Sequence, residues 1–243
     1  MNTCRQSHIR ALLLDALGTI VELEPPPPAL RALLAERFGI QVDETQAARA
    51  IAAEMSYYRS RMAQGRDAAS VAALRADCAE VLRGALAPSP QLRAIDGAAM
   101  TELLLDTLRF RLFPDARDAI VLARRRGLRV VIASNWDALL ADVLSELGLS
   151  PLLHGIVTSA QVGAPKPAAA VFRAALAAAG AQPHEALHVG DSFADDVIGA
   201  RAVGIEPILL RRDGERGPAG VRTIQSLDAL AALCAAASRS GEP

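Results

Sequence analysis

The stretch Ala11-Leu12-Leu13-Leu14-Asp15-Ala16-Leu17-Gly18-Thr19 decides the fold of this chain. Its four apolar residues are too few for a buried helix and match a short buried strand, which runs directly into the carboxylate of Asp15. Gly18 marks a turn shortly after the strand ends. A strand of this kind needs partners in a sheet, so the rest of the chain must supply further strands.

Apolar runs of similar length recur later, at Val130–Ala133, Gly155–Val157, Ala186–Val189 and Pro207–Leu210. Helical patterns separate most of these runs, and each pattern is followed by a glycine: Pro114–Arg126, Asp137–Leu147, Pro167–Ala179 and Phe193–Val203. Strands and helices therefore alternate from residue 112 onward. This alternation predicts an α/β fold, a doubly wound parallel sheet of the Rossmann-like type.

Residues 24–109 interrupt this alternation. The prolines Pro25–Pro28 open the segment and predict an extended, semi-rigid hinge, because proline runs favour extended backbone. Helical patterns without a convincing strand follow at Ala29–Phe38, Glu44–Gln64, Ala68–Leu86 and Ala98–Arg109. We interpret residues 24–109 as a helical domain inserted into a discontinuous core domain, residues 1–23 and 110–243. We expect the insert to act as a mobile lid.

The composition excludes several classes of function. With 26 Lys and Arg against 27 Asp and Glu, the net charge of −1 offers no general attraction to nucleic acid or acidic membranes. No apolar run approaches the ~20 residues of a membrane span, and Met1–Arg10 lacks the apolar segment of a signal peptide. Cys4, Cys78 and Cys234 are too few and too scattered for a disulfide framework or a paired-cysteine metal site. We expect a cytoplasmic protein that acts on a small molecule, with its oligomeric state undetermined.

Polar residues follow three of the predicted strands at the point where each strand ends. They are Asp15 after the first strand, Ser134 and Asn135 after the second, and Gly190 and Asp191 after a third, with Asp195 and Asp196 close behind. In an open α/β sheet, ligands bind beyond the carboxyl ends of the strands. If these strands are neighbours, the polar side chains converge on one crevice.

Lys166 is the only lysine in the chain, and it lies between Pro165 and Pro167. Lysine carries a compact ammonium charge, whereas arginine is a planar fork with spread charge. One lysine retained among so many arginines indicates a position where a point charge is needed. Together with a carboxylate nucleophile, a hydroxyl and an acidic cluster, it forms a set suited to a phosphoryl group.

These motifs, in this order, resemble those of the haloacid dehalogenase-like hydrolase superfamily. Phosphatases of that family carry a D-x-D-G-T motif, a strand-end Ser or Thr, a Lys, and a G-D-x-x-x-x-D motif. In this chain the matching residues are Asp15 to Thr19, Ser134, Lys166, and Gly190-Asp191 with Asp196. The resemblance implies a Rossmann-like core with a helical cap in the place of the insert.

The resemblance also implies a division of roles. Asp15 would be the nucleophile, with Lys166 and Ser134 as further catalytic residues; Ser134, Asn135 and Lys166 would bind the substrate. Mg²⁺ would be held by Asp15, the backbone carbonyl of Leu17 and Asp191. Asp196 would complete the metal site through a metal-bound water, with Asp195 as the less favoured candidate. His188 lies inside an apolar strand, and we interpret it as a core histidine.

Leu17 departs from the family's pattern. Family phosphatases have at this position an Asp that protonates the leaving group, and leucine lacks any such group. Three readings therefore stay open: a Mg²⁺-dependent phosphatase of restricted activity, a metal-independent 2-haloacid dehalogenase in which Asp15 attacks carbon, and a non-catalytic binding or regulatory protein. The dehalogenase reading is supported by the bulky Leu17 and the pair Ser134-Asn135, whereas Gly190-Asp191 favours a metal site.

Overall fold

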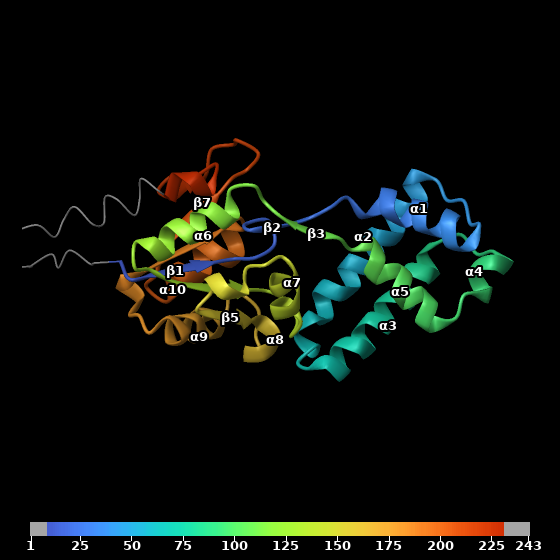
Figure 1. Ribbon diagram of the computed structural model, residues 1–243, viewed down its shortest axis with the longest axis horizontal. Helices are drawn as coiled ribbons and strands as arrows, with labels where there is room; N and C mark the ends of the chain where they lie inside the picture. The colour runs from blue at the N-terminus through green and yellow to red at the C-terminus, as the bar shows by residue number, and fades with distance from the viewer. Residues whose placement is uncertain (1–8, 231–243) are drawn as a thin grey trace, which may run out of the picture. The chain divides into compact units, whose positions relative to one another are not determined.

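The computed structural model describes residues 9–230, which fall into two compact units (Figure 1). The first unit contains the chain up to Glu22, Leu112–Trp136, and the chain from Leu140 onward. The second unit contains Leu23–Arg111 and the short stretch Asp137–Leu139. Cys4 and Cys234 lie outside the described residues.

The first unit is built on a six-stranded sheet whose paired strands are all parallel. Its order is β5-β4-β1-β6-β7-β8. The strands are β1 (Ala11–Leu14), β4 (Arg129–Ser134), β5 (Gly155–Thr158), β6 (Ala186–Gly190), β7 (Glu206–Leu210) and β8 (Arg222–Ile224). This arrangement confirms the predicted α/β fold, and β8 is a strand that the sequence analysis missed.

Helices cover both faces of this sheet (Figure 1). They are α6 (Ala116–Arg125), α7 (Leu140–Glu146), α8 (Ser159–Val162), α9 (Ala169–Ala179) and α10 (Gly199–Ala202), with 3-10 turns at Ser150–Leu152, Pro183–Glu185 and Leu227–Ala229. Phe172 and other residues of α9 pack on Leu13 and Val131, which are fully buried. β1 is buried on both faces, as its uninterrupted apolar sequence predicts.

The second unit is helical apart from the strand residues at its ends. It contains α1 (Pro26–Phe38), α2 (Glu44–Arg61) with a 3-10 turn at Met62–Gln64, α3 (Ala68–Ala85), α4 (Pro90–Ala94) and α5 (Gly97–Thr107). Aspartates cap three of these helices: Asp43, Asp67 and Asp96 accept hydrogen bonds from backbone N–H groups of the first turn. Leu34, Leu82, Met100 and Leu103 lie fully buried in its own apolar core. The lid role expected for this unit stays a prediction.

The prediction for Pro25–Pro28 was wrong. Helix α1 begins at Pro26, so three of the four prolines form its first turn and only Pro25 precedes the helix. The first backbone N–H groups of a helix have no intrahelical acceptor, and the fixed φ angle of proline is already helical. Prolines are therefore tolerated in this turn, and the run initiates a helix where an extended hinge was expected.

Two further strands, β2 (Val21–Leu23) and β3 (Phe110–Leu112), form a separate two-stranded sheet. They contain the residues at which the chain passes between the two units. Hydrogen bonds flank the pair, from the Glu24 amide to the Arg109 carbonyl and from the Phe113 amide to the Ile20 carbonyl. Strands of three residues are too short to give a periodic signal in a sequence.

The stretch Asp137–Leu139 was placed in the core domain by the sequence analysis, but it belongs to the helical unit. The buried Asp137 carboxylate accepts hydrogen bonds from Arg75 and from the Tyr58 hydroxyl, both at 2.9 Å. In residues 9–230 no helix combines the length and the apolarity that crossing a membrane requires.

Candidate active site

The strand order brings the predicted site residues to one edge of the sheet. β1 lies between β4 and β6, with Leu14 opposite Ile132 on one side and Val189 on the other. The Asp15 amide continues the ladder by donating to the Val189 carbonyl at 2.9 Å. Asp15, Ser134 and Asp191 therefore stand at the carboxyl ends of three adjacent strands, as their positions in the sequence predicted.

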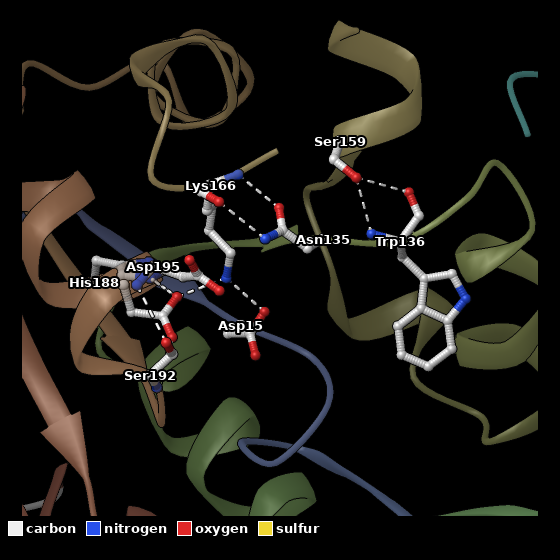
Figure 2. A network of polar contacts seen from close by, with 9 residues as sticks. Asp15, Asn135, Trp136, Ser159, Lys166, His188, Ser192 and Asp195 are labelled. Atoms are coloured by element: carbon white, nitrogen blue, oxygen red, sulfur yellow. Dashed lines mark hydrogen bonds and ion pairs between the residues drawn. The ribbon is translucent and has the colours of Figure 1, made fainter. Parts of the chain in front are cut away.

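Lys166 binds two of the predicted carboxylates, and Figure 2 shows its contact with Asp15. Its Nζ lies 2.6 Å from Asp15 Oδ1 and 2.6 Å from Asp196 Oδ1. Lys166 is only 4% exposed, so this ion pairing occurs with little water present. Burial disfavours the ammonium charge, but Asp15 and Asp196 outweigh it and raise the pKa of Lys166 to about 12. Lys166 is therefore a stable positive charge beside the Asp15 carboxylate.

Asn135 fixes the backbone of Lys166. Its side-chain oxygen accepts from the Lys166 amide at 2.6 Å, and its side-chain nitrogen donates to the Lys166 carbonyl at 3.1 Å (Figure 2). In the structure, Asn135 therefore positions Lys166. Direct contact between Asn135 and a substrate stays a prediction.

Of the two adjacent aspartates, it is Asp196, and not Asp195, whose carboxylate lies in the cluster with Asp15 and Asp191. Asp196 is 1% exposed and accepts hydrogen bonds from the Ser192 amide at 3.0 Å and from Lys166. Burial opposes ionisation of its carboxyl group, but Lys166 and His188 outweigh burial and hold the pKa of Asp196 well below its usual range. Asp196 is therefore an anion under ordinary conditions.

A turn of π-helix, Phe193–Ile198, carries Asp196. The sequence analysis predicted an ordinary helix over Phe193–Val203, but the regular α-helical part is confined to α10. The Ser192 hydroxyl caps the π-turn by accepting from the Asp195 amide. π-turns inside helices are uncommon and recur at functional sites, because the extra residue changes where a side chain projects.

His188 has a second role besides packing. It is fully buried and meets Phe172 edge to face, with ring centroids 5.1 Å apart, as expected of a core histidine. Its Nε2 also lies 2.8 Å from Asp196 Oδ1. A contact chain thus runs from His188 through Asp196 and Lys166 to Asp15. An isolated histidine in an apolar strand gives no sequence signal for this contact.

Two glycines allow the acidic residues to approach the backbone. At Gly190, a Cβ atom would lie 2.1 Å from Asp196 Cγ; at Gly18, it would lie 2.2 Å from Asp191 Oδ2. Gly18 also has a φ of +82°, in the region that favours glycine. The glycines of both sequence motifs are therefore required by close packing of carboxylates.

The acidic cluster fits a divalent cation. Ligand oxygens of Asp15, Asp191 and Asp196 lie within 4.8 Å of one another. Lys166 balances only one of these three charges. Burial raises the pKa of Asp15. Asp191 is exposed to solvent at the mouth of the cluster, but partial loss of water together with the charges of Asp15 and Asp196 raises its pKa to about 7. A hard cation such as Mg²⁺ takes oxygen ligands and would relieve this repulsion.

The Leu17 carbonyl stays a predicted ligand. Leu17 lies in the tight turn after β1, where it forms a β-bridge with Val21. Ser134 is buried at the end of β4 and hydrogen-bonds to the Asp15 carboxylate, which lowers the pKa of Asp15 against the larger effect of burial. The structure thus brings together Asp15, Ser134, Lys166, Asp191 and Asp196.

Comparison with known families leads to the same family that the sequence motifs resemble. Residues 9–204 match the family model of haloacid dehalogenase-like hydrolases. The chain belongs to this family of hydrolases. The matched residues include the turn after β1, Lys166 and the acidic cluster.

The chain spans between about a third and just over half of the length of the curated relatives that it matches. Haloacid dehalogenase-like hydrolase domain-containing protein 3 of Mus musculus is 44% identical over 87 residues, 36% of this chain and 35% of that protein. A phosphoserine phosphatase of Thermus thermophilus is 37% identical over 105 residues, 43% of this chain and 42% of that protein. The similarity therefore covers part of each relative.

Solved structures show the same fold at low sequence identity. A phosphatase of this family from Thermococcus onnurineus aligns with a TM-score of 0.64 and 22% identity, over 93% of this chain and 97% of that chain. A 2-haloacid dehalogenase from Pseudomonas syringae aligns with a TM-score of 0.66 and 22% identity, over 94% and 99% of the two chains. Because both chemistries use this fold, the fold alone does not choose between them.

We expect Mg²⁺ to raise the Tm of the wild type, and the replacement of Asp191 by asparagine to remove that shift. At a Mg²⁺ concentration about 100-fold above its Kd, binding would stabilise the wild type by about 2.7 kcal/mol, or about 5 to 10 °C in Tm for a chain of this size. The Asp191→Asn variant should show little of this shift, while Asp195→Asn should keep it. An equal shift in the wild type and Asp191→Asn would remove Asp191 from the metal site.

Without metal, the Asp191→Asn variant should be more stable than the wild type. The folded-state pKa of Asp191, about 7, lies above the value of 3.8 for a free aspartate, so the folded state holds this proton more tightly. The stability linked to this group is present at low pH and is lost as pH rises from about 4 through 7. With EDTA above pH 7, Asp191→Asn should therefore melt higher than the wild type, and the difference should close toward pH 4.

Proposed function

We propose that this chain is a Mg²⁺-dependent phosphatase that forms an aspartyl-phosphate on Asp15 and acts on a small phosphorylated molecule. The observation that carries the proposal is the charge balance of the site, in which one ammonium group faces three clustered carboxylates. A metal-independent dehalogenase could use Asp196 to hold Lys166, but it would have no use for the carboxylate of Asp191. The phosphatase names of several relatives support the same reaction type.

The first half of the reaction uses Asp15 as the nucleophile. A carboxylate oxygen of Asp15 attacks phosphorus, and the bond from phosphorus to the leaving oxygen breaks with its electron pair on the leaving group. Mg²⁺ held by Asp15, Asp191, Asp196 and the Leu17 carbonyl would offset the negative charge of the phosphoryl oxygens. Lys166 and the Ser134 hydroxyl would hold phosphoryl oxygens as charge develops on them.

The second half releases phosphate. Water attacks the phosphorus of the aspartyl-phosphate, the bond from phosphorus to Asp15 breaks, and the carboxylate is regenerated. Leu17 is unable to activate that water or to protonate the earlier leaving group. Both steps are therefore expected to be slower than in a phosphatase with an acid at this position, and an initial burst should precede a low steady rate.

A panel of phosphate esters, acyl phosphates and 2-haloacids, each assayed with Mg²⁺ and with EDTA, tests the proposal. We expect phosphate release that requires Mg²⁺. Metal-independent halide release would establish a dehalogenase instead. Binding of Mg²⁺ and phosphate without turnover of any substrate would establish a non-catalytic binding protein.

The missing acid at Leu17 predicts a substrate preference. Aryl and acyl phosphates leave as weakly basic anions, whereas a sugar phosphate leaves as a strongly basic alkoxide that needs a proton. The first step, which forms the aspartyl-phosphate, should therefore be about 10²- to 10⁴-fold slower on alkyl phosphates than in a phosphatase with the acid, with little loss in that step on aryl phosphates. Leu17→Asp should raise kcat on an alkyl phosphate more than on p-nitrophenyl phosphate, and Leu17→Asn, which lacks the proton, is the matched control.

Rapid hydrolysis of alkyl phosphates by the wild type would contradict this prediction. It would mean that another residue supplies the proton. An equal gain from Leu17→Asp and Leu17→Asn would show that polarity at this position, and not acidity, limits the rate.

A further inference from the structure

A polar network contacts the loop that carries Asp15 and lies outside the residues assigned above. Its centre is Arg212, which follows β7. Arg212 Nη2 donates to the carbonyl oxygen of Thr19 at 2.7 Å and to Asp115 Oδ1 at 2.9 Å, while Nη1 donates to Asp115 Oδ2 at 3.0 Å. The guanidinium plane lies over Phe113, 3.8 Å from the ring centroid. Hydrogen bonds therefore hold the edge of the guanidinium group, and the Phe113 ring covers its face.

Asp115 gives this network a firm anchor. Its side chain is 9% exposed, and Oδ2 also accepts from the Ser226 hydroxyl at 2.9 Å and from the Leu227 amide at 2.8 Å. Burial works against ionisation of Asp115, but hydrogen bonds from Arg212, Leu227 and Ser226 outweigh burial and lower its pKa. The carboxylate therefore stays charged and holds Arg212 in one orientation.

The Thr19 carbonyl lies at the far end of the nucleophile loop. The Ala16 carbonyl accepts from the amides of Thr19, Ile20 and Val21, so the loop is a single tight turn. Thr19 is fully buried, and its hydroxyl has no hydrogen-bond partner among the described groups. Its side chain therefore adds no polar tie to the turn, whereas Arg212 binds the turn's backbone directly.

We propose that Arg212 is a positioning residue for the reaction at Asp15. It holds the turn Asp15–Thr19 so that the nucleophile and the backbone N–H groups after it keep the orientation that a phosphoryl group requires. A guanidinium group is needed because a planar fork satisfies Asp115 and the Thr19 carbonyl while stacking on Phe113. Lysine would have to give up part of this set. The proposal rests on the proposed function for its kinetic consequences, but its effect on the turn is independent of activity.

Arg211 offers a matched control. It is the adjacent arginine, and its side chain pairs with the exposed carboxylates of Asp213 and Glu215, both outside the nucleophile turn. With p-nitrophenyl phosphate and Mg²⁺, Arg212→Ala should lower kcat about 10²-fold, the size of effect expected when a reacting group is displaced. Arg212→Lys should lower kcat nearly as far, with KM little changed. Arg211→Ala should stay within about twofold of the wild type.

Free guanidinium at non-denaturing concentrations should restore part of the kcat of Arg212→Ala and leave Arg211→Ala unchanged. A general loss of stability would give a lower Tm without such rescue. Wild-type kcat in Arg212→Ala would overturn the proposal, and so would a loss that follows the unfolded fraction and is not rescued.

Hydrogen–deuterium exchange of the segment from Ala11 to Val21 decides the question apart from activity. Exchange of the amides after Asp15 should be faster in Arg212→Ala than in the wild type, and unchanged in Arg211→Ala. Unchanged exchange in Arg212→Ala would overturn the positioning role. Absence of phosphate release from the wild type would instead overturn the proposed function, while the exchange result still decides the role of Arg212.

Discussion

Asp15→Asn is expected to abolish phosphate release, with a loss of about 10⁴- to 10⁶-fold, the range observed when one member of a catalytic group of residues is removed. Asparagine has nearly the same shape as aspartate, but its amide does not attack phosphorus. The fold should persist, because the Asp15 amide still donates to Val189 and Lys166 still pairs with Asp196. Stopped assays of phosphate release and a thermal melt measure both effects.

Asp213→Asn is the matched control for this change. Asp213 is an exposed aspartate that pairs with Arg211, and it should tolerate the same substitution without loss of turnover. Full activity in Asp15→Asn would exclude a covalent mechanism on this residue.

Lys166→Arg is expected to lower kcat about as severely as Lys166→Ala, by about 10²- to 10³-fold, the cost of removing one preorganised charged or hydrogen-bonding group. The Lys166 Nζ fits between Asp15 and Asp196 at 2.6 Å from each, in a site with almost no exposure. A guanidinium group is longer and planar, so it does not fit there without displacing one of the carboxylates. The retained positive charge should therefore not rescue the reaction.

The two variants should differ in stability. Lys166→Ala leaves Asp15 and Asp196 without their buried partner, and breaking a buried ion pair costs about 3 to 5 kcal/mol. Rates must therefore be normalised to the folded fraction at each temperature. Near-normal turnover by Lys166→Arg would show that any cation suffices, and that the chain's only lysine has no special role.

The strands and their polar ends could be predicted because each is a local signal. An apolar run followed at once by Asp15, Ser134 or Asp191 needs only a few residues to be recognised. Parallel pairing then follows from the alternation with helices, and pairing is what brings the ends together. The sequence also contains the two glycines, although the close contacts that require them are visible only in the structure.

Other features depend on contacts between residues far apart in the chain. Arg212 and Thr19 are separated by 193 positions, and Arg212 and Asp115 by 97, so no local pattern relates them. The π-turn is a further example, since a single extra residue per turn leaves the apolar pattern of the helix almost unchanged. Both Asp195 and Asp196 lie in this turn, and it is Asp196 that pairs with Lys166.

The proline run shows a different limit of sequence reasoning. Pro25–Pro28 suit both an extended segment and the first turn of a helix, since the φ angle of proline is compatible with each. The apolar residues that follow, Leu30, Leu33 and Leu34, are buried in the helical core and decide for the helix. Tertiary packing therefore overrides the preference of an isolated proline run.

Detection of a phosphoryl group on Asp15 tests the central claim most directly. The protein is mixed with p-nitrophenyl phosphate and Mg²⁺, quenched in acid within the initial burst, digested, and analysed by mass spectrometry. The account predicts an acid-stable phosphoryl adduct on the peptide that contains Asp15, absent with EDTA and absent in Asp15→Asn. Steady release of phosphate with no adduct on Asp15 at any time, or equal release by Asp15→Asn, would contradict it.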